Sequence, residues 1–412
     1  MSRPFDLDFV RSQFPAFAEP SLEGWAFFEN AGGSYACRQT IERLTNFYTR
    51  TKVQPYAGSG YPASTRGGDE MDAAHARLAG LLNVADSELL IGPSTSQNTY
   101  VLANAFRQNW SDGDEIVVTD QDHEANSGVW RRLADRGIVV RQWHVDPHTG
   151  QLDPAALAGL LNDRTRLVAF PHCSNIVAHI NPVAEITALT HEAGAVAVVD
   201  GVSQAPHGIC DVDALGADVY LFSTYKTFGP HQGVMVVRHR IDDQLANQSH
   251  WFNDYSAHKR LVPAGPDHAQ VAACNGVVDY VEALHDHHFD EGGADLAAKG
   301  RRVKELVRDR EIELVTPLLD FLRSRRDVRI MGPSDPTIRV PTVAIVPSRP
   351  PLEVAKDLVD HRVMADAGDF YAVRLIEAMG QPADPGVLRM SFVHYTSPDE
   401  VSRLVEALEQ VL

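Results

Sequence analysis

The chain has 412 residues, of which 44% are hydrophobic, and its 29 glycines and 24 prolines are ordinary in number. This length and composition are typical of a globular protein with two sizeable cores and exclude a fibrous or disordered chain. Its 37 basic residues are outnumbered by 55 acidic ones, so a formal net charge of -18 disfavours nucleic acid or an anionic membrane as a partner.

The start of the chain and its cysteines indicate a cellular location. Residues 1–8 are polar and acidic, and no later apolar run is long enough to span a bilayer, so we expect a cytoplasmic protein. The four cysteines lie far apart and form no C-x-x-C pair. The sequence therefore predicts neither a zinc site nor a disulfide framework, and we expect no metal.

A short amphipathic helix is expected over residues 6–17, followed later by a βαβ series from 89 to 238. Short apolar runs predict seven strands, mostly buried on both faces. They are 89–92, 115–119, 138–143, 166–172, 195–200, 219–223 and 233–238. Helical periodicity is present at 97–107, 127–136, 154–161 and 183–192. This pattern predicts an α/β fold with a seven-stranded, mostly parallel sheet covered by helices.

The character of the chain changes after about residue 290. A long helix near 270–285 is expected to lead into a charged amphipathic segment at 296–325, strands at 328–331, 342–346 and 387–393, and a helix at 398–412. We therefore expect a smaller C-terminal α+β domain. The predicted division is a large domain over 26–290 and a small domain made of 1–25 and 291–412.

Reactive polar residues follow five of the predicted strands, at the sheet edge where open α/β folds bind their ligands. They are Ser94, Thr95 and Ser96; His123; Ser174 and Asn175; Asp200 with Gln204; and Ser223 to Lys226. Pyridoxal phosphate needs an amine for an imine, an anion beside its pyridine nitrogen and donors for its phosphate. This set of residues offers all three.

Lys226 is the candidate amine. It follows an apolar segment, 219–225, which favours a buried, partly deprotonated lysine over an exposed, solvated one. Asp200 closes the apolar strand 195–199, where a carboxylate is costly unless it is paired. A protonated pyridine nitrogen would pair it, and capping of the turn at Gly201 is the alternative. Lys226 after the next strand favours the first interpretation.

Ser94, Thr95 and Ser96 precede the helix at 97–107, so their hydroxyl and N–H groups lie at a helix N-terminus, which is a natural phosphate site. Plain helix capping is the alternative, and the phosphate interpretation depends on Ser223 and Tyr225 converging there.

Three further residues have candidate roles at the ring of the cofactor. His123 could stack on the pyridine and transfer protons, or it could be a solvated loop histidine. Asn175 and Gln204 could donate to the ring oxygen, or they could satisfy backbone groups.

These residues resemble motifs of the class V aminotransferases, which are fold-type I pyridoxal phosphate enzymes, and among them the cysteine desulfurase and selenocysteine lyase branch. The most specific stretches are VDGVSQA at 199–205 and ADVYLFSTYKTFGP at 217–230, which resemble the signatures around the aspartate and the lysine of the family. SNI at 174–176 with NPV at 181–183, HEAN at 123–126 and NAGGS at 30–34 are also similar to family motifs. Tyr225 stands where the desulfurases usually have histidine, and it can still donate to a phosphate.

The resemblance implies a homodimer with its active sites near the interface, where residues 265–269 reach a neighbouring cofactor. It also implies that Arg389 binds the substrate carboxylate, a role that its fork of donors suits, and that Asn30 lies on the substrate side. A surface arginine on a strand is the alternative for Arg389.

One departure from the family concerns its reaction. In the desulfurases a late loop cysteine attacks the substrate sulfur, whereas the matching stretch here is AGDFYAV at 367–373, with Tyr371 in the loop. No cysteine follows Cys274, so a thiolate relay through this loop is not expected. The aromatic loop favours an apolar or aromatic-lined substrate pocket.

The leading hypothesis is a pyridoxal phosphate enzyme that acts on the α-amino group of a small amino acid. The family chemistry passes through an external aldimine and a quinonoid to elimination or transamination. An epimerase, or a cysteine desulfurase with a non-standard nucleophile, stays open. A non-catalytic, cofactor-binding regulatory protein is the alternative of another class. A nucleotide-binding α/β enzyme has little support, because neither G-x-G-x-x-G nor G-x-x-x-x-G-K-[ST] occurs.

Overall fold

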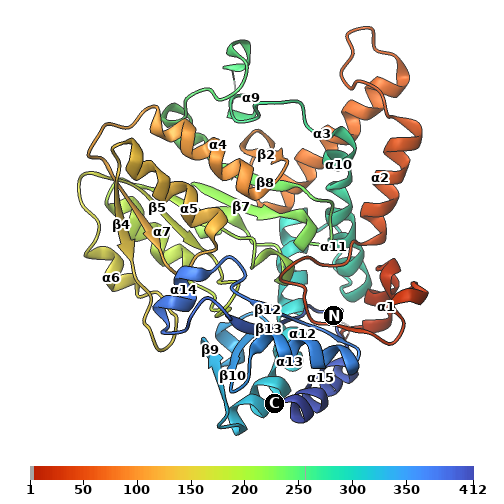
Figure 1. Cartoon of the computed structure of the whole chain (residues 1–412). Helices are drawn as coiled ribbons and strands as arrows, with labels where there is room; N and C mark the ends of the chain where they lie inside the picture. The colour runs from red at the N-terminus through yellow and green to blue at the C-terminus, as the bar shows by residue number, and fades with distance from the viewer. Residues whose placement is uncertain (1–3, 256) are drawn as a thin grey trace.

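A seven-stranded sheet forms the centre of the fold in the computed structural model, which describes residues 4–255 and 257–412 (Figure 1). The strand order is β2-β8-β7-β6-β5-β3-β4. The strands are β2 Leu89–Gly92, β3 Glu115–Thr119, β4 Val139–Trp143, β5 Thr165–Pro171, β6 Val196–Asp200, β7 Val219–Ser223 and β8 Gly233–Val237. Strands β3 to β7 pair in parallel, and β8 is antiparallel to β2 and β7. The predicted mostly parallel sheet is confirmed.

Burial explains why apolar runs became strands. Every residue of β2, β3, β6, β7 and β8 is buried, as expected for strands covered on both faces. Only the edge strand β4 alternates between exposed and partly buried residues before ending on buried Trp143. The parallel pairing brings the carboxyl ends of β5, β6 and β7 to one edge of the sheet.

Four helices of this part correspond to the predicted ones: α4 Thr95–Arg107, α5 Glu124–Arg131, α6 Pro154–Ala158 and α7 Val183–Glu192. The short α8 Val212–Leu215 was not predicted. Helix α5 begins three residues before the predicted start, because the ring of His123 caps it by accepting a hydrogen bond from the N–H of Ala125. A 3₁₀ turn, Arg132–Arg136, continues the segment as far as Gly137, whose φ of 85° ends it.

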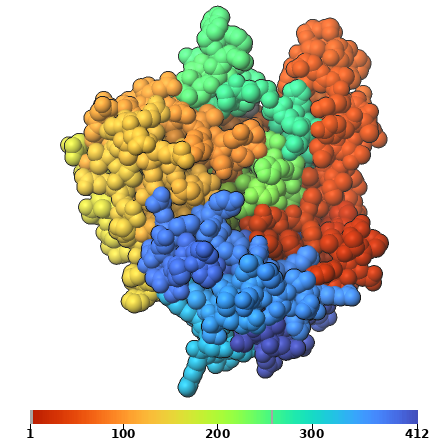
Figure 2. Space-filling model, in the orientation of Figure 1, coloured from red at the N-terminus to blue at the C-terminus, as the bar shows by residue number. Residues whose placement is uncertain are grey.

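Two long helices, α2 Arg38–Arg50 and α3 Pro62–Leu82, were not predicted. They pack against α10 His268–Ala273 and α11 Asn275–His288, which replace the single helix expected near 270–285. The contact is close at Gly276, where a Cβ atom would lie 2.4 Å from the backbone nitrogen of Thr40. The α2–α3 turn and the segment with α9 Ala257–Arg260 project from the same end of the molecule (Figures 1 and 2).

The C-terminal part is an α+β region, as predicted. Its antiparallel sheet has the order β12-β13-β10-β9, and a short parallel pair joins β1 to β11. The strands are β1 Ala26–Phe27, β9 Val328–Met331, β10 Thr342–Pro347, β11 Val363–Met364, β12 Asp366–Gly368 and β13 Val387–Ser391. The helices are α12 Leu296–Ser324, α13 Pro351–Asp360, α14 Val373–Ala378 and α15 Pro398–Val411. In Figure 2 the blue C-terminal residues lie against the yellow and orange surface of the sheet-containing part.

The N-terminal segment contacts both parts. The expected helix over 6–17 is interrupted: α1 covers Leu7–Ser12, and a 3₁₀ turn starts at Pro15, which has no N–H to continue an α-helix. Arg11 forms an ion pair with Glu400, while the Phe14 ring contacts Tyr280 as well as Tyr395. The division into 26–290 and 1–25 with 291–412 therefore stays a prediction, and residues 1–3 lie outside the described part of the chain.

Two absences concern the residues that the structure describes. None of their helices is both long and apolar enough to cross a membrane. In the same ranges, 4–255 and 257–412, no group of three or more metal-binding side chains is present.

Candidate active site

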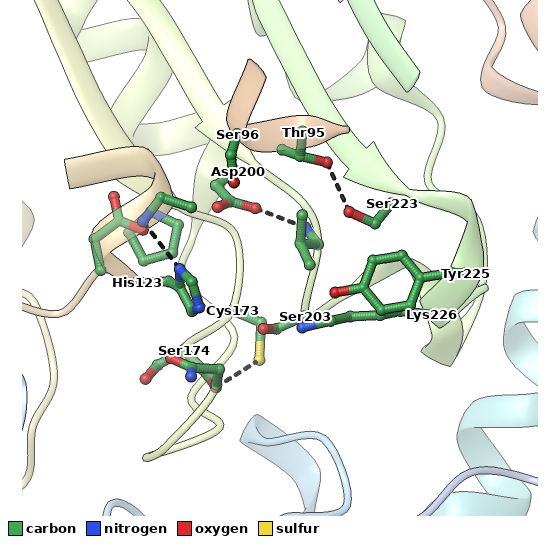
Figure 3. A pocket seen from close by; sticks show the side chains of 15 residues that line it. Thr95, Ser96, His123, Cys173, Ser174, Asp200, Ser203, Ser223, Tyr225 and Lys226 are labelled. Atoms are coloured by element: carbon green, nitrogen blue, oxygen red, sulfur yellow. Dashed lines mark hydrogen bonds between the residues drawn. The ribbon is translucent and has the colours of Figure 1, made fainter. Parts of the chain in front are cut away.

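A cavity opens beyond the carboxyl ends of β5, β6 and β7 (Figure 3). It brings together nine residues that the sequence singled out from separate strand ends. These are Thr95, Ser96, His123, Ser174, Asn175, Asp200, Ser223, Tyr225 and Lys226. Of the other candidates, Asn30 lines a smaller neighbouring cavity that Lys226 also lines.

Lys226 is buried at the end of β7, in the 3₁₀ turn Thr224–Lys226, and its side chain extends into the middle of the cavity (Figure 3). Its ammonium group has no hydrogen bond or ion pair with the residues that the structure describes. Burial and, to a smaller extent, the charge of Arg389 lower the pKa of Lys226, while Asp200 and Glu29 raise it, and the resulting pKa is about 8. A fraction of this amine is therefore neutral and nucleophilic near pH 7.

Two carboxyl groups are buried on the same wall. Asp200 ends β6 and accepts a hydrogen bond from the N–H of Val202 at 2.8 Å, and burial raises its pKa to about 6. Asp122 accepts a hydrogen bond from Asn126 at 2.6 Å, while its Oδ1 has no partner among the described residues. Burial and the nearby Asp200 raise the pKa of Asp122 well above its usual value. Burial and the neighbouring charge therefore favour the protonated form of Asp122, and Asp200 is the carboxyl group that can carry the negative charge.

His123 enters the cavity as a neutral ring. Its Nδ1 accepts the N–H of Ala125 at 3.0 Å, which assigns the ring proton to Nε2. Burial lowers the pKa of His123 to about 3, and the charges of Lys226 and Arg389 add to this effect. The outer face of the ring lies 5.2 Å from the ring of Tyr371, measured between centroids.

Hydroxyl groups meet at the N-terminus of α4, as expected for an anion site. Thr95 Oγ1 and Ser223 Oγ lie 2.7 Å apart and share a hydrogen bond (Figure 3). Ser94 caps the helix instead, because its Oγ accepts the N–H of Gln97 at 3.2 Å. The N-terminus of α4 can lie this close to β8 only because residue 233 is glycine: a Cβ atom there would lie 2.4 Å from the Thr95 nitrogen. The phosphate role of all three helix residues stays a prediction.

Two buried amides have unused hydrogen-bonding capacity near this wall. Asn175 donates to the carbonyl of Phe370 at 2.9 Å, but its Oδ1 has no partner among the described residues. Gln204 is buried, and its Oε1 is likewise unpaired within the described ranges. The bond to Phe370 fixes the Asn175 amide, so its free Oδ1 can accept a hydrogen bond from a ligand, whereas the Gln204 amide can be assigned either way and can offer a donor.

The substrate-side candidates belong to the C-terminal part and the loop before α2. Arg389 is buried in β13, with its Nη2 2.6 Å from Glu29 Oε1 and its Cζ 3.8 Å from the Phe370 ring centroid. Burial lowers the pKa of Arg389, and Glu29 opposes that shift. Asn30 uses its amide to join the loop to β13: it donates to the Ser391 carbonyl at 3.1 Å and accepts from the hydroxyl of Tyr395.

The loop between β12 and α14 covers the cavity edge in a strained conformation. Phe370 and Tyr371 have φ values of 49° and 58°, which residues with side chains rarely adopt. The carbonyls of both residues accept hydrogen bonds, from Asn175 at 2.9 Å and from the N–H of Glu124 at 2.8 Å. These bonds hold the loop on the sheet-containing part. Tyr371 itself is 70% exposed.

Sequence reasoning missed two residues of this region, Asp122 and Glu29. Each stands directly before a motif residue, His123 or Asn30, and that adjacency was the available signal. An acidic residue in a loop is usually solvated, so the sequence alone gives no reason to expect either carboxyl group near a buried site.

Comparisons with known proteins agree with this architecture. A family model described as aminotransferase class-V matches residues 26–404. The aminotransferase-like protein FGM3 of Gibberella zeae is 33% identical over 424 residues, covering 100% of both chains. A cysteine desulfurase of Serratia proteamaculans is 27% identical, over 99% of this chain and 98% of that protein.

Solved structures share the fold over nearly the whole chain. The apo cysteine desulfurase of Thermococcus onnurineus NA1 has a TM-score of 0.86 at 22% identity and covers 100% of this chain and 99% of its own. A lysine-to-alanine mutant of C-DES, with glycine covalently linked to its PLP cofactor, has a TM-score of 0.77 at 20% identity, covering 97% and 98%.

Proposed function

The chain belongs to the aminotransferase class V family and is cysteine desulfurase-like, and from that premise we propose that it is a pyridoxal phosphate-dependent enzyme acting on the α-amino group of a small amino acid. The observation that carries the proposal is Lys226. Lys226 is a buried amine with a pKa of about 8 and no ionic partner among the described residues. Burying such a group costs free energy of folding, so its presence indicates a role in a reaction.

The residues around Lys226 fit the cofactor. Asp200 is charged and buried, and the protonated pyridine nitrogen would give it the cationic partner that it lacks. Thr95, Ser223 and the N-terminus of α4 offer donors to a phosphate. When bound, pyridoxal phosphate supplies an electron sink for charge that develops on the substrate α-carbon.

Each residue has a defined task in this proposal. Lys226 would hold the cofactor covalently, and its neutral Nζ would remove the α-proton of the substrate. Asp200 would keep the pyridine nitrogen protonated. The neutral ring of His123 would cover the ring of the cofactor and adds no positive charge to the site.

The substrate carboxylate is assigned to Arg389, which is buried, permanently charged and within the electrostatic reach of Lys226. Phe370 lies against Arg389 and Tyr371 lies against His123, so the two aromatic rings favour an apolar substrate side chain. Asn30 serves this side indirectly, because both ends of its amide hold the loop against β13.

The cysteines favour elimination or transamination over sulfur transfer to a protein thiol. All four are buried, and only Cys173 lines the main cavity within the described residues. Burial raises the pKa of the Cys173 thiol far above its usual value, so the nucleophilic thiolate is scarce at neutral pH. The loop at 367–373 contributes aromatic rings in place of a thiol.

The proposal includes a cytoplasmic homodimer. Trp251, Phe252 and Tyr255 are 87%, 60% and 71% exposed on the projecting segment near α9, which is unusual for large aromatic side chains facing water. Burial of these rings against a second copy would explain them. Light scattering of the purified protein should give twice the chain mass of 45.3 kDa, and the single-chain mass would refute the dimer.

Two measurements test the proposed function. The purified protein should absorb visible light from bound pyridoxal phosphate, and amino acids should change that absorbance. Incubation with a panel of amino acids, followed by assays for sulfide, pyruvate, ammonia and keto acids, separates elimination from transamination. A colourless protein that binds no pyridoxal phosphate would refute the proposal. A coloured protein whose spectrum no amine alters would favour a non-catalytic, cofactor-binding role.

A further inference from the structure

The guanidinium group of Arg389 is already paired with a carboxylate of the protein itself. Glu29 Oε1 lies 2.6 Å from Nη2, and this is an ion pair between residues 360 positions apart in the sequence. The other donors of the guanidinium are nearly unused: Nε has no partner among the described residues, and Nη1 has only a 3.5 Å contact with the carbonyl of Asn175.

Glu29 stands in the way of a second carboxylate on Arg389. A guanidinium can hold a carboxylate through two parallel hydrogen bonds on either of two edges, one formed by Nε and Nη2 and the other by Nη1 and Nη2. Nη2 has two N–H groups, one on each edge, so the single contact with Glu29 Oε1 takes up one of the edges. The negative charge of Glu29 repels a carboxylate on the other edge, and the Phe370 ring covers a face of the group at 3.8 Å. A substrate carboxylate therefore competes with Glu29 for Arg389.

The Glu29 side chain can move away from Arg389 more easily than Arg389 can move. Its side chain is 24% exposed, whereas that of Arg389 is 4% exposed, so the glutamate can turn toward water while the arginine cannot. The Oε2 of Glu29 is buried and has no hydrogen bond within the described residues, so one oxygen alone holds the carboxylate in place.

The neighbouring loop makes room for Glu29 in this position. A Cβ atom on Gly32 would lie 2.6 Å from Glu29 Oε1, so only glycine lets the carboxylate reach Arg389. The φ of Gly32 is not in the left-handed region, so an alanine can adopt the same backbone conformation. Its methyl group would collide with the Glu29 carboxylate.

We propose that Glu29 competes with the substrate for Arg389: it occupies Arg389 in the free enzyme and is exchanged for the α-carboxylate of the substrate. This inference rests on the proposed function, in which Arg389 receives that carboxylate. The exchange keeps the buried charge of Arg389 paired in both states, because leaving it alone would be costly. A simple amine, which brings no carboxylate, leaves Glu29 in place, so the competition lowers the affinity for amino acids and does not change the affinity for amines.

Two variants remove the competition in different ways. Glu29→Gln keeps the size of the side chain and removes its charge, whereas Gly32→Ala keeps every charge and pushes the carboxylate off Arg389. Glu282→Gln is the matched control, because Glu282 on α11 is 30% exposed and pairs with Arg77 of α3, away from the site.

The test measures the dissociation constants of L-alanine and of propionate for each holoenzyme by calorimetry, with ethylamine as the amine control, and the thermal midpoint with and without ligand. In both variants the two carboxylates should bind about tenfold more tightly, about 1.4 kcal/mol, and should raise the thermal midpoint by more than in wild type. Ethylamine binding should not change in either variant, and Glu282→Gln should behave as wild type.

The outcomes separate this inference from the proposed function. Wild-type protein that carries no cofactor and binds no amino acid would overturn both. A coloured, amino-acid-binding protein whose carboxylate affinity is unchanged or weaker in Glu29→Gln and Gly32→Ala would overturn the exchange alone, and would make Glu29 a permanent partner of Arg389.

Discussion

The two sides of the cavity differ in how their polar groups are satisfied. On the sheet side, the ammonium group of Lys226 has no ion pair, and Asp122 Oδ1 and Asn175 Oδ1 have no hydrogen-bond partner, among the described residues. On the C-terminal side, the charge of Arg389 is paired with Glu29 and the amide of Asn30 is satisfied at both ends, and of these side chains only Arg389 Nε and Glu29 Oε2 have no partner within the described ranges. The first side is organised for a ligand that stays bound, whereas the second is closed by the protein's own groups and must open for a ligand that comes and goes.

This contrast predicts different consequences for substitutions on the two sides. Changes on the sheet side should alter retention of the cofactor, and changes on the C-terminal side should alter substrate binding while the cofactor stays.

The largest effect is expected for Asp200→Asn. Removing one partner of a buried ion pair costs about 3–5 kcal/mol, so the affinity for pyridoxal phosphate should fall about a hundredfold or more. Equilibrium dialysis against the cofactor measures it. Asp122→Asn is the matched control, because burial and the nearby Asp200 favour the protonated form of Asp122, and its affinity should stay close to that of wild type. Equal losses in both variants would mean that the two carboxyl groups have been assigned the wrong charges.

The next effect is expected for Arg389→Lys. Lysine keeps the charge but loses the two-donor fork, and a lost charge-assisted hydrogen bond costs about 1.5–3 kcal/mol. The KM for amino acids should rise about ten- to a hundredfold, while the cofactor absorbance is unchanged. Loss of the cofactor in this variant would contradict the division between the two sides.

A third prediction concerns pH. Lys226 must be neutral to capture the cofactor, and its pKa of about 8 lies below the usual value for lysine. The rate at which apoprotein takes up pyridoxal phosphate should therefore rise with pH, with a midpoint near 8, and level off above it. Stopped-flow absorbance at constant ionic strength measures the profile. Because Glu29 raises the pKa of Lys226, Glu29→Gln should move the midpoint to lower pH, and a shift to higher pH would contradict the electrostatics of the site.

The smallest effect is expected for Tyr371→Ala. The tyrosine ring contacts the ring of His123 at the exposed edge of the cavity, and an aromatic pair contributes about 0.5–1.5 kcal/mol. The KM for amino acids should rise by a factor of about 2 to 10. Tyr371→Phe retains the ring and should behave as wild type; if it is as impaired as the alanine variant, the hydroxyl group and not the ring contact is what matters.

The sheet could be predicted from the sequence because its strands are apolar on consecutive residues and end in polar ones. Strand β9 and helix α7 have the predicted bounds. Helices α2 and α3 were missed for local reasons. Only Thr40 and Phe47 are buried in α2, so its apolar stripe is weak, and α3 contains Gly67 and Gly68 in its first half.

The candidate site was predictable where each residue follows its own strand, as for Asp200 and Lys226, because parallel strands bring their ends together. The pairing of Glu29 with Arg389 was not predictable. It depends on how the loop before α2 meets β13, and no local pattern in either segment encodes that contact. The protonation of Asp122 likewise depends on burial that only the folded chain creates.

The central claim is that Lys226 holds pyridoxal phosphate covalently, and borohydride reduction followed by peptide mass mapping tests it most directly. The reduced cofactor should be found on the peptide that contains Lys226 in wild type and in the exposed-lysine control Lys356→Arg, and should be absent from Lys226→Arg. Cofactor on a different lysine, or none on any peptide of a protein saturated with pyridoxal phosphate, would contradict the account.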